Sequence, residues 1–316
     1  MNQPFFTIAI PVYNRLNYLK EAIQSVLSQS FKDYELLIID DGSTEGGIWD
    51  YISTLTDIRI RAIRNPKNLG IVPNWIKCIS EANGTWFKFL LSDDILFSNS
   101  LTILHNLIIS YSDNFVIVTS GKDFRSTNEI EDFLNNDKRE LSDSDKYLIP
   151  MKEIINRRKR FNQTWANPNA YTLLNSDLKE LTGAKNFKKV VKILGMTGHC
   201  VDYYILYAIA IKYKTMIEMD FPLYGTRCHA TNFSKTYNQD LLYHLRGDRF
   251  IHYLLYDYKG TENFFMIRHA FRIYFHKIIS NKRAIFTMSF PIKTIQLLIF
   301  LYEFIFKINV ESKLAR

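Results

Sequence analysis

The sequence predicts an α/β fold with a mainly parallel central sheet flanked by helices and with a helical C-terminal extension. Two observations predict the sheet: short apolar runs of strand length end at polar or glycine-containing loops, and segments with apolar residues at helical spacing separate them. Strands that alternate with helices in this way pair in parallel through right-handed crossovers. A third observation, the basic and apolar composition beyond Asp240, predicts the extension.

The first strand, helix and strand are predicted within residues 6 to 43. Phe6 to Ile10 is an apolar run that ends at Pro11-Val12-Tyr13-Asn14-Arg15. Glu35 to Ile39 is a second run, which Asp40-Asp41-Gly42-Ser43 closes. The helix between them is predicted by five apolar residues that share one face, namely Leu19, Ala22, Ile23, Val26 and Leu27.

The same alternation continues to residue 119. A short helix at Ile48 to Ser53 and a strand at Ile58 to Arg64 precede a loop at Asn65 to Gly70, and a helix begins near Pro73. Within the stretch from Trp86 to Phe97, an apolar run followed by polar residues predicts a buried strand with Asp93 and Asp94 at its tip. A helix starting near Ser98 or Ser100 and a strand at Phe115 to Thr119 follow.

The second part of the chain is less regular. Residues 125 to 148 are polar with few apolar anchors, which predicts an exposed loop or lid. Met151 to Phe161 is predicted as a basic helix, and a second sheet region begins between Trp165 and Tyr171. A helix near residues 198 to 208 would carry Asp202 in its first turn, and Met216 to Met219 would be a strand.

Composition restricts the setting of the protein. Three cysteines favour a reducing cytosol over a disulfide framework, and the first residues lack the basic region and cleavage site of a signal peptide. Of the 40 Lys and Arg residues, 12 lie between Arg246 and Arg316, against 5 of the 32 Asp and Glu residues. Long aliphatic and aromatic runs separate these charges, which favours an anionic membrane surface over nucleic acid as partner. Thr294 to Ile308 is short and interrupted for a membrane crossing, which favours an interfacial helix.

Asp93 and Asp94 are the chemically most informative pair. Adjacent carboxylates repel each other unless a cation intervenes, so a divalent metal that carries a phosphorylated ligand fits them. The alternative is a polar turn that caps the next helix. No glycine-rich phosphate loop follows any predicted strand, which argues against a dinucleotide-binding fingerprint and a P-loop.

Several motifs together resemble a known family. The succession Ile10-Pro11-Val12-Tyr13-Asn14-Arg15, Asp40-Asp41-Gly42-Ser43, Asn68-Leu69-Gly70 and Ser92-Asp93-Asp94 is similar to the inverting family 2 glycosyltransferases of the GT-A fold, of the bacterial surface-polysaccharide type. Val201 to Leu206 and Pro222 to Ser234 resemble later motifs of that family. The resemblance covers residues 5 to 235.

The resemblance implies a binding site for a nucleotide-sugar donor. Pro11 and Tyr13 would border the base, Asp41 would accept a hydrogen bond from it, and Asn68 would close a loop beside the nucleotide. Asp93 would then face the ribose or the metal.

The resemblance also implies a metal and a catalytic base. Asp94 would bind Mn²⁺ or Mg²⁺ directly, and His229 would be a further metal or diphosphate contact or else a structural residue. Ser92 stands where many relatives have the first acid of an Asp-x-Asp triplet, which implies a weaker metal site or a single protein carboxylate. Asp202 would be the base that takes the proton of the acceptor hydroxyl, or else an acid that stabilises the helix dipole. Arg227 is either a solvated charge or a diphosphate contact.

The sequence therefore predicts an inverting glycosyltransferase at the cytoplasmic membrane face, which transfers a sugar to a glycan or lipid-linked oligosaccharide acceptor. Residues 1 to 240 would form the GT-A domain, with a nucleotide-sugar half at 1 to 124 and an acceptor half at 125 to 240. Residues 241 to 316 would form a tail that binds the membrane or a second subunit. A non-catalytic nucleotide- or glycan-binding module remains the alternative, whereas a nucleotidyltransferase would need a glycine-rich loop after the first strand.

Overall fold

The computed structural model describes residues 3–111, 115–136, 141–142, 145–150, 167–185, 187–188, 191, 201–213 and 215–228. Nearly all of these belong to one compact unit, residues 1–187 and 196–229, and the fold is that of this unit. His229, the predicted helix at residues 151 to 161 and the tail at 241 to 316 lie outside the described residues. In the described part of the chain, no helix is long and apolar enough to span a membrane.

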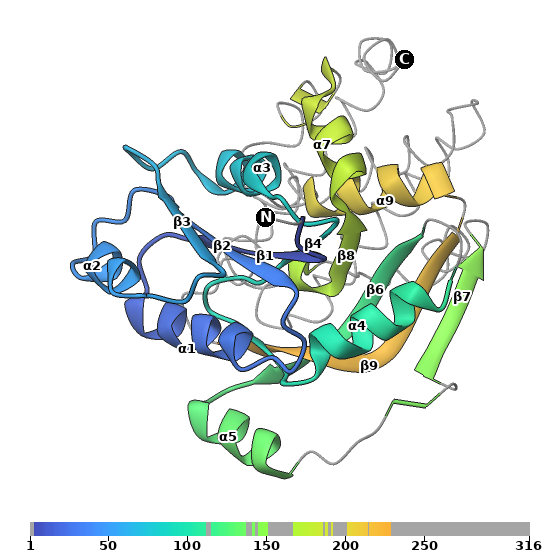
Figure 1. Ribbon diagram of the computed structural model, residues 1–316, viewed down its shortest axis with the longest axis horizontal. Helices are drawn as coiled ribbons and strands as arrows, with labels where there is room; N and C mark the ends of the chain where they lie inside the picture. Colours follow the sequence, from blue (N-terminus) through green and yellow to red (C-terminus); the bar gives the residue numbers. More distant parts are fainter. Residues whose placement is uncertain are drawn as a thin grey trace, which may run out of the picture. The chain divides into compact units, whose positions relative to one another are not determined.

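The chain alternates strands and helices over most of its described length (Figure 1). The strands are β1 Phe6–Val12, β2 Tyr34–Asp40, β3 Ile60–Arg64, β4 Trp86–Phe89, β5 Ile95–Leu96, β6 Val116–Phe124, β7 Lys146–Pro150, β8 Tyr171–Leu174 and β9 Thr215–Arg227. The helices are α1 Leu16–Leu27, α2 Ile48–Ser53, α3 Ile71–Glu81, α4 Ser100–Ile109, α5 Thr127–Asn136, α7 Asn175–Gly183 and α9 Val201–Tyr213, with a 3₁₀ turn η2 at Pro168–Ala170.

These strands form one sheet in the order β3-β2-β1-β4-β8-β6-β9-β5, and β7 pairs with β9. The first four strands pair in parallel, as do β6 and β9. Four further pairs are antiparallel. The predicted α/β class with a central sheet flanked by helices is confirmed, and its sheet is mixed in its second half.

The connections reverse direction between β1 and β4. From β1 the chain moves outward through α1 to β2 and through α2 to β3, and α3 then carries it back past both strands to β4. Right-handed crossovers place helices on opposite faces when the direction of travel reverses. Figure 1 shows α3, α7 and α9 grouped on one side of the sheet, where α3 contacts α7 and α7 contacts α9. The carboxyl ends of β1 and β4 thus form a topological switch point, the usual ligand site of open α/β sheets.

Burial explains why the first strands read as continuous apolar runs. All seven residues of β2 are buried, because helices cover both faces of a parallel sheet. Helix α1 buries four of its predicted apolar residues, and α3 buries Val72, Trp75, Cys78 and Ile79. Each buried Val, Leu or Ile side chain among them contributes about 1.5–3 kcal/mol of burial free energy.

The prediction of a loop or lid at residues 125 to 148 is wrong, since this stretch contains α5 and β7. Ile130 of α5 is buried in a cluster with Phe97 and Phe124, and Phe133 packs against it. The amide of Glu129 donates to Ser126 Oγ, and the Glu129 carboxylate accepts from the amide of Arg125. Two apolar anchors and a capping arrangement are therefore enough to form this polar helix.

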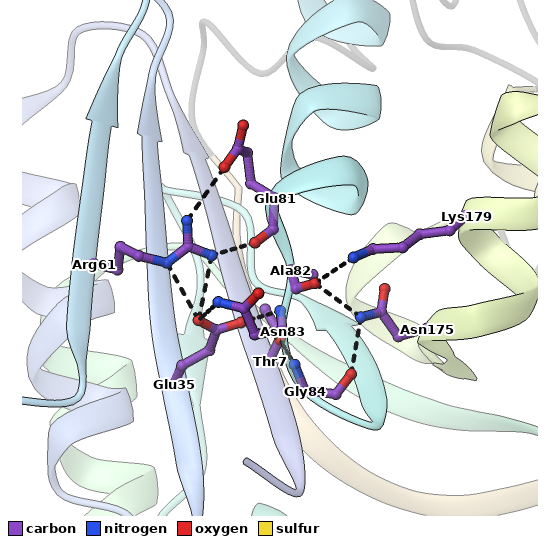
Figure 2. A network of polar contacts seen from close by, with 9 residues as sticks. All are labelled: Thr7, Glu35, Arg61, Glu81, Ala82, Asn83, Gly84, Asn175 and Lys179. Carbon is purple, nitrogen blue, oxygen red and sulfur yellow. Dashed lines mark hydrogen bonds and ion pairs between the residues drawn. The ribbon is translucent and has the colours of Figure 1, made fainter. Parts of the chain in front are cut away.

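A polar network pins the amino-terminal ends of the strands, at the sheet edge opposite the switch point (Figure 2). The buried carboxylate of Glu35 accepts hydrogen bonds from Thr7 Oγ1 at 2.6 Å and from the amide of Asn83. It also pairs with the Arg61 guanidinium at 3.3 Å. Asn175 donates to the carbonyl oxygens on both sides of Asn83. The network joins β1, β2, β3 and α7 to the turn between α3 and β4.

Candidate functional site

The loop after β1 has an unusual backbone. Asn14 and Arg15 adopt left-handed conformations with φ of 62° and 69°, which residues other than glycine rarely adopt. The loop after β2 holds them there: Asn14 Oδ1 accepts from the amides of Thr44 and Glu45, and the amide of Arg15 donates to the Glu45 carboxylate at 2.6 Å. Such strain persists only where surrounding contacts fix it, and it gathers at functional sites.

Asp41 ties the loop after β2 to the loop after β3. Its carboxylate accepts from the amides of Leu69 and Gly70 at 2.9 and 3.0 Å, and from Asn65 Nδ2 at 2.8 Å. A Cβ at Gly42 would lie 2.6 Å from the carbonyl carbon of Lys67, so only glycine allows these loops to approach. A carboxylate accepts about four hydrogen bonds, which leaves about one acceptor position on Asp41 for a ligand.

The other predicted nucleotide contacts lie at the same edge of the sheet. Asn68 is exposed, and its Oδ1 accepts from the amide of Gly70 at 2.9 Å. Pro11 pairs with Ile39 near the end of β1, and the following Tyr13 is 42% exposed. The structure therefore places Pro11 near the end of β1, and Tyr13, Asp41 and Asn68 in the loops after β1, β2 and β3. Their contacts with a nucleotide remain predictions.

Asp93 belongs to this group through an ion pair. Arg15 Nη1 lies 2.6 Å from Asp93 Oδ2, with both side chains partly exposed. The pair spans the switch point, because Arg15 follows β1 and Asp93 follows β4. Arg15, the last residue of the Pro11 to Arg15 motif, thus contacts the loop from Leu91 to Asp94 directly. This loop is called the acidic loop below.

Asp94 is far more buried than its neighbour, with 2% of its surface exposed. Its Oδ1 accepts from the amide of Arg227 at 3.0 Å, and its Oδ2 accepts from Asn169 Nδ2 at 2.5 Å. Burial and the negative charge of Asp93 raise the pKa of Asp94 to about 8. A cation bound at this pair would lower that pKa by offsetting the repulsion.

Asp93 and Asp94 fit a hard divalent cation that completes its coordination elsewhere. Carboxylate oxygens suit Mg²⁺ and Mn²⁺, and Mg²⁺ is commonly held by one or two carboxylates together with substrate phosphates and water. Among the described residues, no cluster of three or more His, Cys, Asp or Glu side chains could hold an ion without such help. The predicted contribution of His229 falls outside the described residues.

Asn169 and Arg227 support this site, and neither role was foreseen. Arg227 is not a solvated charge: it is 5% exposed, its guanidinium pairs with Glu21 of α1, and it lies over the Tyr18 ring. Asn169 is fully buried within the turn η2. The only sequence signal for Asn169 is the Asn-Pro-Asn turn, which does not indicate its distant partner.

Asp202 lies in the first turn of α9, as predicted, and is 8% exposed. It lines a pocket that is otherwise apolar, together with Trp75, Phe87, Phe89, Pro168, Tyr171, Leu173, Leu178 and Ile205. Pro168 is the neighbour of Asn169, so η2 both lines this pocket and supplies the amide that donates to Asp94. The position is compatible with a base and with an acid that stabilises the helix N-terminus.

Comparison with known families settles the relationship of the chain. A sequence model described as "Glycosyl transferase family 2" matches residues 7–181. The chain belongs to glycosyl transferase family 2. The family 2 match includes Asp41, Asp93, Asp94 and Asn169, whereas Asp202 and Arg227 follow it.

Family 2 membership agrees with individual relatives. An uncharacterized glycosyltransferase of Rickettsia conorii is 38% identical over 133 residues, which are 39% of this chain and 21% of that protein. One of Haemophilus influenzae is 34% identical over 123 residues, or 38% of this chain and 48% of that protein. The glycosyltransferase GlyG of Streptococcus pneumoniae is 26% identical over 179 residues, which are 50% of this chain and 58% of that protein. The chain therefore matches less than two thirds of the length of each of these relatives.

The family 2 fold also occurs in a solved structure. The crystal structure of S. aureus TarS 1-349 in complex with UDP-GlcNAc has a TM-score of 0.63 at 14% identity, covering 95% of this chain and 80% of that chain. At this identity the likeness concerns the fold alone. It confirms the predicted GT-A fold.

Proposed function

We propose that this protein is an inverting glycosyltransferase that transfers a sugar from a nucleotide-diphosphate sugar to a glycan acceptor carried on a lipid. The observation that carries the proposal is the joining of Asp93, Arg15 and the buried Asp94 at the switch point of a family 2 domain. Synthesis of O-antigen, capsule or lipooligosaccharide is the setting that this chemistry fits.

The donor would occupy the loops at the carboxyl ends of β1, β2 and β4. Tyr13 and Pro11 would border the base, Asp41 would use its remaining acceptor position for it, and Asn68 would close the loop beside it. Asp93 and Asp94 would hold Mn²⁺ or Mg²⁺, which stabilises negative charge on the departing diphosphate. The UDP-GlcNAc held by TarS makes this nucleotide sugar the first donor to test.

Asp202 would act on the acceptor. Inversion requires a carboxylate that takes the proton of the acceptor hydroxyl while its oxygen attacks opposite to the leaving diphosphate. The apolar walls of the Asp202 pocket limit the access of water to this carboxylate. Exclusion of water favours transfer over hydrolysis of the donor.

The decisive experiment measures release of nucleoside diphosphate from a panel of nucleotide sugars that includes UDP-GlcNAc, with Mn²⁺ and a lipid-linked glycan extract. Asp94→Ala and Asp202→Asn should abolish turnover while circular dichroism shows a folded chain. The exposed Asp220 of β9 offers a matched control, and Asp220→Asn should keep full activity. Activity in both site variants would refute the assignment. Binding of nucleotide without turnover of any donor would favour the non-catalytic module.

We further propose that residues 241 to 316 attach the enzyme to an anionic membrane surface at the cytoplasmic face. The full chain should sediment with vesicles that contain anionic lipid, and added salt should weaken this binding. Replacing Arg268, Arg272, Lys282 and Arg283 by glutamine should weaken it as well. If these replacements leave binding unchanged and the protein is dimeric without lipid, the apolar stripe of the tail is a subunit interface instead.

A further inference from the structure

Lys88 is a fully buried lysine in the middle of the sheet. It lies in β4, between Ile8 of β1 and Thr172 of β8, and none of its surface is exposed. Its ammonium donates a hydrogen bond to the main-chain oxygen of Asn169. It also lies 5.7 Å from the centre of the Tyr224 ring. The proposed reaction described above assigns this residue no role.

Packing alone does not account for a lysine at this position. Removing an ammonium from water is costly, and an apolar side chain of similar volume commonly gives an equal or greater stability. The cost is visible here, because burial lowers the pKa of Lys88 to about 7. The hydrogen bond to Asn169 is the specific contact that an apolar replacement would lose.

Asn169 carries this contact to the acidic loop. Its Oδ1 accepts from the amide of Leu91 at 2.7 Å, and its Nδ2 donates to the Asp94 carboxylate. The loop from Leu91 to Asp94 is itself a turn, in which the amide of Asp94 donates to the oxygen of Leu91 at 3.0 Å. The Asn169 side chain therefore clamps both ends of the turn that presents Asp93 and Asp94.

We propose that Lys88 is a positioning residue of the donor site: by holding the main-chain oxygen of Asn169, it fixes the side chain that orients Asp94 toward the cation and the donor diphosphate. This inference rests on the proposed function. Lys88 does not touch the donor, because it is wholly enclosed by the sheet. Its effect reaches the site through one residue, which makes the chain of contacts testable.

The test measures Mn²⁺ binding to the full chain by calorimetry in the presence of saturating UDP, whose phosphates would complete the coordination of the ion. Lys88→Met should weaken Mn²⁺ binding by about tenfold or more, as loss of an outer partner of a metal ligand commonly does. Its resistance to urea should equal or exceed that of the unchanged protein. Lys122→Met is the matched control, since Lys122 is exposed on β6 with its ammonium 4.8 Å from the Phe133 ring, and it should bind Mn²⁺ normally.

A double-mutant cycle separates this role from a general loss of structure. Asn169→Ser removes the clamp and keeps the main-chain oxygen, so it should weaken Mn²⁺ binding as Lys88→Met does. Adding Lys88→Met to Asn169→Ser should then change binding by less than about twofold, because the two residues act in series. Additive effects, or unchanged Mn²⁺ binding in a folded Lys88→Met protein, would overturn the inference. If Lys88→Met does not fold, Lys88→Arg, which keeps a donor, should bind Mn²⁺ as the unchanged protein does, whereas Asn169→Ser should bind it more weakly. Equal binding by these two variants would overturn the inference.

The outcome for the unchanged protein keeps the two proposals apart. If it binds no Mn²⁺ and turns over no donor, the proposed function fails. If it binds Mn²⁺ and turns over donor while the Lys88 and Asn169 variants bind the ion equally well, only the role of Lys88 fails.

Discussion

The Arg15 guanidinium and the Asp93 carboxylate lie 2.6 Å apart and join the loop after β1 to the loop after β4. They are 78 residues apart in the chain, yet the reversal of direction between β1 and β4 brings them to one edge. The pair places one positive charge beside two carboxylates, at the position where the proposed donor would bring its diphosphate.

We expect Arg15→Ala to raise the KM for the donor by about tenfold, corresponding to about 1.5 kcal/mol of charge-assisted hydrogen bonding. The value of kcat should change less, because Asp202 and the pocket that it lines are untouched. Steady-state kinetics with the best donor of the panel measures both constants. Arg59→Ala is a matched control, since Arg59 forms a pair of equal length with Asp57 before β3. An equal rise in KM for both variants would contradict the role of Arg15.

The raised pKa of Asp94 predicts a pH dependence of stability. The folded chain keeps a proton on Asp94 up to about pH 8, whereas the unfolded chain releases it near the ordinary pKa of about 3.9. The stabilisation that comes from holding this proton in the folded chain is therefore complete at low pH and declines as the pH rises toward 8. Asp94→Asn has no carboxyl group at this position, so its stability lacks this pH dependence.

The difference in unfolding free energy between the metal-free wild type and Asp94→Asn should thus fall with rising pH, by at most about 1.4 kcal/mol per unit. Urea denaturation at several values from about pH 5 to about pH 8 measures this slope, which is independent of any constant cost of the substitution. A slope of zero or of opposite sign would show that Asp94 is ionised in the folded protein.

Glu35 should be the most sensitive member of the network in Figure 2. Glu35→Gln should lower the free energy of unfolding by about 1–3 kcal/mol, because the Arg61 and Asn83 donors lose a charged acceptor that is itself buried. Glu81→Gln changes a carboxylate whose side chain is 40% exposed and should cost less than about 1 kcal/mol. Urea denaturation distinguishes them, and the donor KM should be normal in both, since the network lies at the opposite edge from the site. Equal costs would contradict the importance of burial.

Gly84 should tolerate no side chain. A Cβ there would lie 2.3 Å from the Thr7 nitrogen and 2.4 Å from the Phe6 carbonyl carbon, and neither main-chain atom can move without shifting β1. Gly84→Ala should therefore cost about 3 kcal/mol or more, or prevent folding. Gly183 of α7 has open space at the same point, so Gly183→Ala should be neutral or stabilising by up to about 1 kcal/mol. Thermal unfolding compares the two, and a mild effect at Gly84 would show that the strands can separate there.

Local patterns predicted the first half of the fold well. The apolar face of α1 and the runs of β1 and β2 depend on neighbours in the sequence, and the structure confirms them. Helix α5 was missed because it has few apolar residues, although Ser126 and Glu129 carry a capping signal. Predictions for residues 241 to 316 lie outside the described residues and stay predictions.

The surroundings of Asp94 could not be predicted in the same way. Its partners Asn169 and Arg227 lie 75 and 133 residues further along the chain, and no local periodicity relates such positions. Lys88 would ordinarily be expected at the surface, because lysine is almost never fully buried. The motifs indicated where Asp93 and Asp94 lie in the fold, whereas the residues that contact them could be found only in the three-dimensional structure.

The placement of β8 between β4 and β6 has a consequence for biosynthesis. A chain that emerges from the ribosome in order presents the open edge of β4 before residues 171 to 174 exist to cover it, and the last clamp on Asp94 arrives only with residue 227. Such long-range pairing raises contact order and slows folding, and it leaves a strand edge exposed to aggregation in the meantime. Nascent or truncated chains that stop before β9 would therefore be candidates for chaperone capture, and they would lack a finished acidic loop.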